Sequence, residues 1–473
     1  MAEISKRISK YQELIPILAI SILVFLILLI YLELFYPSPR IFLILIFVPI
    51  LIVLLLNFKL MYRVFILAFF IEFGIYYFYL STLLFPFVTI SFLLNYTVKY
   101  SEIKNQIFYY FLIFLISIIP SYFMAASHPE SYLISFNLLG FIAILLITPI
   151  TLKNLNNVKN IAIYFLIGCI LNAIYLIIMA SISGKREFGF AGIMYVDLGG
   201  IGIILTYSSL LLFKKFKILF GIMTIVLILS LLFTQTRNSW ITTGSVMLIL
   251  TLYYIIKSKQ FKILNLYSFK KIALIIISII SLIIILGIVE PNVFSRVAER
   301  KTQTTEQLAV TMDFGSIATR FFIWEIAFSV FEANPIFGTG FHSFRFISNS
   351  YSTLDPYLYG TFVYNLTPHT TILALLADTG ILGFIGFLIF LYLIIRFFKQ
   401  NLDFSITTDQ KIISFMLFWC QIYIIISMVM TDAWLWGTLH MLWAVLLGVA
   451  VFLRKDIKRT QESVITANSS NER

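Results

Sequence analysis

Two arginines stand at the edges of long apolar runs, where their side chains could perform chemistry at a membrane surface. Arg237 lies in the stretch TQTRNSW and follows Thr236, a residue type that favours the N-cap of a helix. Arg320 lies in SIATRFFIWE, after Thr319, and is likewise expected in the first turn of a helix. A helix N-terminus carries partial positive charge, so a cation there loses about 0.3–1 kcal/mol. A bound anion would reverse this penalty, and the pattern therefore predicts an anion site.

A histidine opens a third polar stretch, TPHTTILALLADTG. Thr367 as N-cap and Pro368 at the first helical position predict a helix start, with His369 in its first turn. The helix dipole there favours the neutral imidazole, which is a suitable general base for a sugar hydroxyl. The alternative reading is that the histidine merely ends a span and that the arginines merely snorkel to water.

The chemistry that fits these residues is displacement of a lipid diphosphate. The planar fork of arginine contacts two oxygens at once and keeps its charge. Two arginines would stabilise the leaving charge while a base activates the acceptor. No acidic cluster or Asp-x-Asp pair accompanies them on the side where they are expected, so neither a metal nor another cofactor is predicted.

Four further residues are expected to support these groups. Trp324 lies on an amphipathic helix that should end before Pro335, with an aromatic face suited to the membrane surface or the helix bundle. Gly338 and Gly340 follow in NPIFGTGF, where glycine allows a backbone to approach a ligand closely. Asp378 lies inside the next apolar run, so it should face the bundle interior, have a partner and act structurally.

The composition is typical of a polytopic α-helical membrane protein. Of 473 residues, 60% are hydrophobic and 12% are charged, which is too little polar surface for a soluble protein of this size. The apolar runs match the hydrocarbon core of a bilayer, and about 12–14 transmembrane helices are expected. The net charge of +12 is attributed to cytoplasmic loops and not to nucleic-acid binding. The candidate spans are 14–35, 40–57, 60–80, 82–98, 106–125, 132–150, 159–180, 196–213, 217–233, 238–256, 272–289, 369–397, 410–429 and 435–453.

The distribution of lysine and arginine orients these spans. A cytoplasmic N-terminus makes every second loop a basic cytoplasmic loop, and it places both termini inside. The sequence predicts a transmembrane bundle over 1–289, further transmembrane helices over 369–453 and a cytoplasmic tail over 454–473. Between them, 290–368 has no spanning run and is far longer than usual connections, which predicts an extracytoplasmic loop with short amphipathic helices. If 60–98 formed one re-entrant unit instead of two spans, the side of every later loop would invert.

In the order and common sidedness of its motifs, the chain resembles bacterial O-antigen ligases and polysaccharide polymerases, which are integral-membrane glycosyltransferases of the GT-C type. The arginine that follows a Thr/Ser-rich turn in that family matches Arg237. The family's arginine, aromatic helix, Asn-Pro and Gly-x-Gly match the segment from Arg320, and its His-x-x-x-Leu with a following acid and glycines matches the segment from His369. The resemblance covers roughly 195–400. Thr370 stands where the family commonly has Asn, and a hydroxyl cannot hydrogen-bond to an acceptor as an amide does. Asp378 stands where the family commonly has Glu.

The resemblance implies metal-independent, inverting transfer of a glycan from undecaprenyl diphosphate to an acceptor hydroxyl, at the outer face of the bacterial cytoplasmic membrane. Arg237 and Arg320 would hold the diphosphate, and His369 would assist the acceptor. The implied partners are the lipid-linked donor, a glycan or lipid-linked acceptor, membrane lipids, and chain-length regulator and flippase proteins. A polymerase of O-antigen, capsule or exopolysaccharide is expected. The alternatives are a ligase that transfers the finished glycan to lipid A core or another acceptor and, in another class, a transporter of lipid-linked glycan.

Overall fold

The computed structural model describes residues 50–73, 78–98, 105–124, 129–183, 188–213, 216–257, 312–432, 434 and 439–471. Over these residues the chain has the all-α polytopic membrane fold that the sequence predicts. Six of the described helices are long and apolar enough to cross a membrane, and three shorter apolar helices accompany them. The expected spans 14–35 and 272–289, together with loop residues 290–311, lie outside the described part of the chain.

Long apolar helices dominate the order of elements, with one small antiparallel hairpin near the beginning, in which Glu72 pairs with Tyr79. The elements are α3 (Phe58–Leu67), η1 (Ala68–Phe70), β1 (Glu72–Phe73), β2 (Phe78–Tyr79), α4 (Leu80–Asn95), α6 (Gln106–Met124), α7 (Pro129–Thr151), α8 (Leu155–Ser183), η2 (Gly189–Met194), α9 (Tyr195–Leu212), α10 (Lys217–Phe233), α11 (Arg237–Lys257), α15 (Met312–Ala333), α16 (Phe344–Ile347), η4 (Ser348–Tyr351), α17 (Pro356–Phe362), α18 (Thr371–Phe404), α19 (Thr408–Met430) and α21 (Leu439–Asn471).

The predicted span 60–80 is wrong as a single straight helix. A short helix, Ile50–Leu56, is bent by 118° against Phe58–Phe70, and the chain then passes through the hairpin into α4. The bend has a local cause at Asn57, whose side-chain Oδ1 accepts a hydrogen bond from the backbone N–H of Leu60 at 3.2 Å. Asparagine in this position satisfies an open N–H at a helix start, so α3 begins anew instead of continuing the preceding helix.

The chain divides into two compact units, and the described residues of the first are 50–62 and 90–97. Hydrogen bonds to main-chain oxygen hold this unit together. The Ser91 hydroxyl and the Asn95 amide donate to the carbonyl of Leu55 at 2.8 and 3.1 Å. The rings of Phe58, Phe92 and Tyr96 pack around them with centroids 5.1–5.8 Å apart, so polar and aromatic contacts act together in this small unit.

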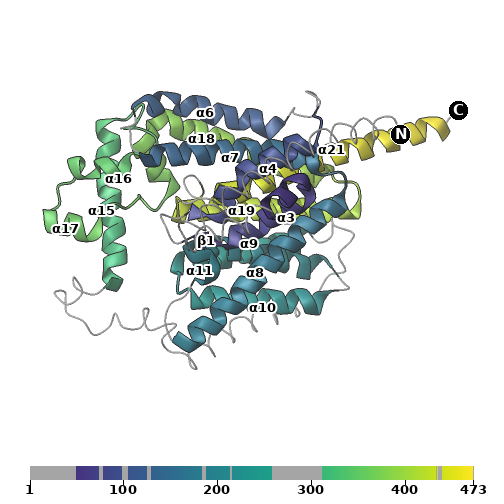
Figure 1. Cartoon of the computed structure of the whole chain (residues 1–473), viewed down its shortest axis with the longest axis horizontal. Coiled ribbons are helices and arrows are strands. Elements are labelled where there is room, and N and C mark those ends of the chain that lie inside the picture. Colours follow the sequence, from purple (N-terminus) through teal and green to yellow (C-terminus); the bar gives the residue numbers. More distant parts are fainter. Residues whose placement is uncertain are drawn as a thin grey trace, which may run out of the picture. The chain divides into compact units, whose positions relative to one another are not determined.

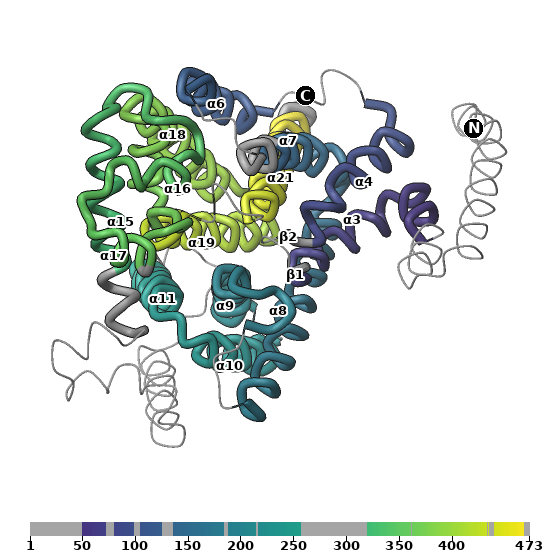
Figure 2. Tube along the Cα trace, turned by 60° about the vertical axis from the view of Figure 1, so that its left-hand side comes forward, coloured from purple at the N-terminus to yellow at the C-terminus, as the bar shows by residue number. Residues whose placement is uncertain are grey.

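The second unit comprises the remaining described residues and contains the helical bundle. In it α18 packs on α6 and α7 packs on α21, while α9 packs on both α10 and α19 (Figure 1). An aromatic cluster fills the space between α6, α7, α18 and α21, with ring centroids 4.5–6.4 Å apart. Its members are Phe111, Phe114, Phe141, Phe390 and Trp443. Helices α15, α16 and α17 lie together at one end of α18 (Figure 2).

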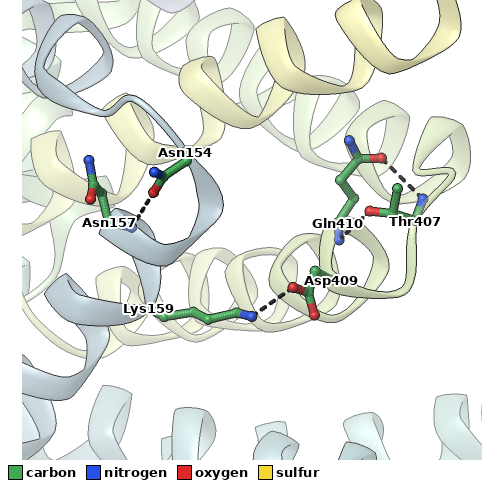
Figure 3. A network of polar contacts seen from close by, with 6 residues as sticks. All are labelled: Asn154, Asn157, Lys159, Thr407, Asp409 and Gln410. Atoms are coloured by element: carbon green, nitrogen blue, oxygen red, sulfur yellow. Dashed lines mark hydrogen bonds and ion pairs between the residues drawn. The ribbon is translucent and has the colours of Figure 1, made fainter. Parts of the chain in front are cut away.

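A polar network joins α8 and α19 at the end of α19 where that helix begins (Figure 3). Thr407 and Gln410 form a capping box, and the Lys159 ammonium pairs with the Asp409 carboxylate at 2.7 Å. The segments that carry Lys159 and Asp409 are both expected on the cytoplasmic side of the membrane, which is consistent with this contact. Because α19 has 23 residues, its other end lies about 34 Å away, and the candidate site is found there.

Candidate active site

Helix α18 is broken at Gly380, and the loop that follows α15 fits into the break. Gly380 has φ 62° and ψ −167°, which no helix accommodates. The N–H groups of Ile381 and Leu382 donate instead to the carbonyls of Pro335 and Ile336, at 2.8 and 3.3 Å. A Cβ at Gly380 would lie 2.4 Å from the carbonyl oxygen of Ile336, so glycine is needed both for the backbone angle and for this approach.

The same loop also satisfies the carbonyl groups on the other side of the break. The N–H groups of Thr339 and Gly340 donate to the carbonyls of Ala377 and Asp378 at 3.2 and 3.0 Å. Gly338 has φ 67°, and a Cβ there would lie 2.4 Å from the carbonyl carbon of Asp378. Backbone groups inside an apolar bundle must find partners. Gly338 and Gly340 therefore serve the contact between loop and helix.

The Asp378 side chain is buried in the bundle and hydrogen-bonded within the fold. It is 2% exposed, and its Oδ1 accepts a hydrogen bond from the N–H of Phe344 at 2.8 Å. The N–H groups of His342 and Ser343 also face this carboxylate. Its main-chain carbonyl accepts a further hydrogen bond from the Ser121 hydroxyl at 2.6 Å. Successive N–H groups make an anion-binding concavity, so Asp378 fixes the turn that begins α16.

A narrow crevice lies beside this turn. Burial lowers the pKa of His342 to about 4, so this histidine is neutral at physiological pH. In the sequence, only its place in NPIFGTGFHSF distinguishes His342. The lining residues are His342, Phe344, Arg345, Thr367, Pro368 and Asp378.

His369 precedes α18 instead of lying in its first turn. The expected helix start at Thr367 and Pro368 is wrong, because α18 begins at Thr371 with Thr370 as N-cap. His369 has φ 54°, a left-handed backbone that a residue with a side chain adopts at a cost of about 1–2 kcal/mol. The indole N–H of Trp324 donates to the carbonyl of Pro368 at 3.0 Å. Trp324 thus helps to hold the segment that presents the imidazole.

Arg320 lies in the middle of a helix and not at its N-terminus. Helix α15 begins at Met312, about two turns earlier, so the dipole argument made for Arg320 is wrong. The predicted end of this helix before Pro335 is confirmed, since α15 ends at Ala333. Burial lowers the pKa of the Arg320 guanidinium, and the carboxylate of Asp432 acts in the opposite direction. What singles out Arg320 is partial burial beside an acid.

Asp432 is the acid whose charge acts on both Arg320 and His369. Burial is the main cause that lowers the pKa of His369; the Asp432 carboxylate raises it and the Arg320 guanidinium lowers it further. Asp432 is 6% exposed. No direct ion pair joins it to Arg320, and among the described residues its Oδ2 has no hydrogen-bond partner. A buried carboxylate oxygen without a partner is costly, which marks this position as one with a function.

Residues from two of the predicted motifs donate hydrogen bonds next to Asp432. The Thr371 hydroxyl donates to the carbonyl of Thr431 at 2.8 Å, and the Asn238 amide donates to the carbonyl of Met430 at 3.4 Å. Asn238 follows Arg237 directly, and Thr371 lies two residues after His369. The segments predicted to share one side of the membrane therefore meet at the end of α19.

Arg237 is the first residue of α11, as the sequence predicts. The preceding turn is tight, with φ 50° at Gln235 and a hydrogen bond from the N–H of Thr236 to the Thr234 hydroxyl at 3.3 Å. Because α11 starts here, the partial positive charge of its N-terminus adds to that of the guanidinium. The position of Arg237 at a helix start thus agrees with the prediction, and an anion site there stays a prediction.

Arg320, His369 and Asp432 act on one another electrostatically, and the start of α11, which carries Arg237, contacts the turn of Asp432 through Asn238. Arginine can hold phosphate oxygens, and a neutral imidazole beside a carboxylate can accept a proton. Among the described residues, no group of three or more His, Cys, Asp or Glu side chains is arranged to hold a metal ion.

The sequence contained a signal for Asp432 that the motif analysis missed. It follows Thr431, the C-cap of α19, in the segment MTDAW between the expected spans 410–429 and 435–453. A helix C-terminus carries partial negative charge and disfavours an anion. The helix-dipole argument that marked Arg237 as a misplaced cation, applied with the signs reversed, marks Asp432 as a misplaced anion.

Comparison with known protein families supports the resemblance noted from the motifs. Residues 222–388 match the family model described as O-antigen ligase, and this region contains Arg237, Arg320 and His369. Over these residues the chain is therefore similar to the O-antigen ligase family. Asp432 lies beyond the matched region. No curated protein matches the chain.

Proposed function

We propose that the protein transfers a glycan from a polyprenyl diphosphate, undecaprenyl diphosphate in bacteria, to an acceptor sugar hydroxyl. The observation that carries this proposal is the convergence of Arg320, His369 and Asp432 beside the turn that contacts the start of α11. The match to the O-antigen ligase family supports a glycosyl-transferring enzyme. The reaction takes place at the outer face of the cytoplasmic membrane, with both chain termini in the cytoplasm.

In the proposed reaction, Arg237 and Arg320 hold the diphosphate of the donor. The acceptor oxygen forms a bond to the anomeric carbon while the bond from that carbon to the diphosphate oxygen breaks. The leaving charge develops on phosphate oxygens, where fixed guanidinium groups stabilise it without reorganisation. Attack from the face opposite the leaving group inverts the configuration, and the residues described supply each of these steps without a metal ion.

The proton of the acceptor hydroxyl passes to His369. Burial and Arg320 keep the imidazole neutral and ready to accept, while Asp432 stabilises the imidazolium that forms. Asp432 thus acts as the group that matches the basicity of His369 to the reaction, in the way that a carboxylate supports a catalytic histidine elsewhere. Trp324 fixes the histidine segment through Pro368.

The acceptor decides between two enzymes with the same chemistry. A polymerase of cell-surface polysaccharide would use a second lipid-linked repeat unit as acceptor, and we favour this reaction. A ligase would use lipid A core or another final acceptor, and the description of the matched family favours it.

The test is a gel profile of lipid-linked and cell-surface glycan in a strain that lacks the gene, complemented with wild type or with His369→Ala. Surface glycan of single repeat units indicates a polymerase. Long chains that remain on the polyprenyl diphosphate indicate a ligase. His369→Ala should reproduce the deletion phenotype at normal protein abundance. Repeat units that stay on the cytoplasmic leaflet would show a transporter and refute the proposal.

A further inference from the structure

A second buried carboxylate lies in the bundle and takes no part in the proposed reaction. Asp197 of α9 is 8% exposed, and its Oδ1 accepts a hydrogen bond from the Ser427 hydroxyl of α19 at 2.5 Å. The indole N–H of Trp434 donates to the same Ser427 oxygen at 3.0 Å. A carboxylate inside an apolar bundle is costly and is usually retained for a function, so the question is what this chain of hydrogen bonds positions.

The chain of hydrogen bonds ends on the turn that carries Asp432. Trp434 lies two residues after Asp432 and is fully buried. On the near side of the turn, the N–H of Thr431 donates to the carbonyl of Ser427 at 2.9 Å. Ser427 therefore holds the turn at two points, through its carbonyl before Asp432 and through its hydroxyl after it. Thr431 and Trp434, on either side of Asp432, are thereby both tied to Ser427.

The direction of these hydrogen bonds depends on Asp197. A serine hydroxyl has one proton to donate, whereas an ionised carboxylate only accepts. With its proton committed to Asp197, the Ser427 oxygen presents its lone pairs to the Trp434 indole, which only donates. Without an acceptor at position 197, the hydroxyl is released from this orientation, and the indole loses a fixed partner.

We propose that Asp197, acting through Ser427 and the Trp434 indole, is a positioning residue that fixes the Asp432 carboxylate against His369 and Arg320. The inference rests on the proposed function, since it assigns Asp197 no contact with substrate. A misplacement of about 1 Å at a reacting group can cost about a hundredfold in rate. Loss of this network should therefore lower kcat while the diphosphate, held by the arginines, still binds.

The decisive variant is Trp434→Phe, which removes the indole N–H and keeps an aromatic ring. Its matched control is Trp443→Phe, because Trp443 is also buried and donates its indole N–H to a side-chain oxygen, that of Gln421, at 2.9 Å. The assay uses membranes with equal amounts of full-length protein and, as donor, the lipid-linked glycan extracted from the deletion strain. Trp434→Phe should lower kcat roughly 10- to 100-fold at unchanged donor KM. A kcat within about twofold of the Trp443→Phe value overturns the proposal.

Substitution at Asp197 separates hydrogen bonding from packing. Asp197→Asn keeps an acceptor oxygen for Ser427, so most of the activity should remain. Asp197→Ala removes the acceptor and should match Trp434→Phe in kcat. Equal loss in Asn and Ala variants would show that the acceptor is not what matters and would overturn the proposed role.

A double-mutant cycle distinguishes positioning from general destabilisation. If Trp434 acts through Asp432, then Trp434→Phe has no further effect on the residual rate of Asp432→Asn, measured in long end-point incubations. If the two substitutions instead lower the rate multiplicatively, Trp434 does not act through Asp432, and the inference is refuted. Full activity of Asp432→Asn would instead refute the role of Asp432 in the proposed function, so the two failures are distinguishable.

Discussion

Removing the indole N–H of Trp324 tests whether the backbone at His369 is part of the catalytic arrangement. Trp324→Phe keeps an aromatic ring beside Phe321, against which the indole packs edge-on. It deletes the hydrogen bond to the buried carbonyl of Pro368. The left-handed backbone of His369 costs about 1–2 kcal/mol, so the segment tends to relax unless its surroundings hold it.

The size of the effect follows from the lost hydrogen bond. A buried carbonyl left without its donor costs about 1–3 kcal/mol, and about 1.4 kcal/mol is a factor of ten in an equilibrium. The fraction of molecules with a productive His369 should fall accordingly, and kcat should decrease roughly tenfold. Because neither arginine is touched, the donor KM should remain near the wild-type value.

The assay is the initial rate of transfer in membranes, with the lipid-linked glycan from the deletion strain as donor. The matched control is again Trp443→Phe, which loses an indole N–H in the bundle away from His369. A wild-type kcat for Trp324→Phe would refute the reasoning, because the hydrogen bond to Pro368 would then be irrelevant to the position of His369. A raised donor KM at unchanged kcat would contradict it equally.

Three further predictions concern the charged groups and the broken helix. Arg237→Lys should lose about tenfold or more in kcat/KM, because an ammonium cannot contact two phosphate oxygens as the planar fork does; near-normal kinetics would mean a snorkelling residue. Asp432→Asn removes the group that raises the pKa of His369, so the pKa falls, and the acid limb of the kcat profile should move to lower pH as kcat decreases. An acid limb that stays in place would show that His369 is not the titrating base. Gly338→Ala places a Cβ 2.4 Å from the Asp378 backbone and should lower the abundance of folded protein in membranes, whereas Gly360→Ala, where nothing lies within 4 Å, should not.

The sequence was most informative where local physics decides the structure. Hydropathy identified the apolar helices, and the start of α11 at Arg237 followed from the capping preference of Thr236 alone. It was misleading where tertiary contacts override local preference. Thr367 and Pro368 look like a helix start, yet the hydrogen bond from Trp324 to Pro368 holds this segment outside α18. The left-handed φ of His369 belongs to that contact and has no local signature.

The two glycine motifs show a second limit of sequence reasoning. Gly338 and Gly380 are 42 positions apart, and each is needed because a Cβ there would lie 2.4 Å from a backbone atom of the other's segment. Taken separately, each motif suggests a flexible or ligand-binding loop. Only their juxtaposition in the fold shows a contact of backbone with backbone, which pairing of distant segments creates and a single sequence does not display.

Two acids near His369 have opposite roles because their surroundings differ. Asp378 faces the N–H groups of the turn before α16 and accepts a hydrogen bond from Phe344, so its side chain is already committed to the fold. Asp432 is also buried, but one of its oxygens has no partner among the described residues, and its charge acts on both His369 and Arg320. A carboxylate saturated by backbone donors stabilises a structure, whereas a buried one with an open oxygen can act on a reacting group. Conservative replacement should therefore divide them: Asp378→Asn should mainly reduce the abundance of folded protein, and Asp432→Asn should mainly reduce turnover of protein that is folded.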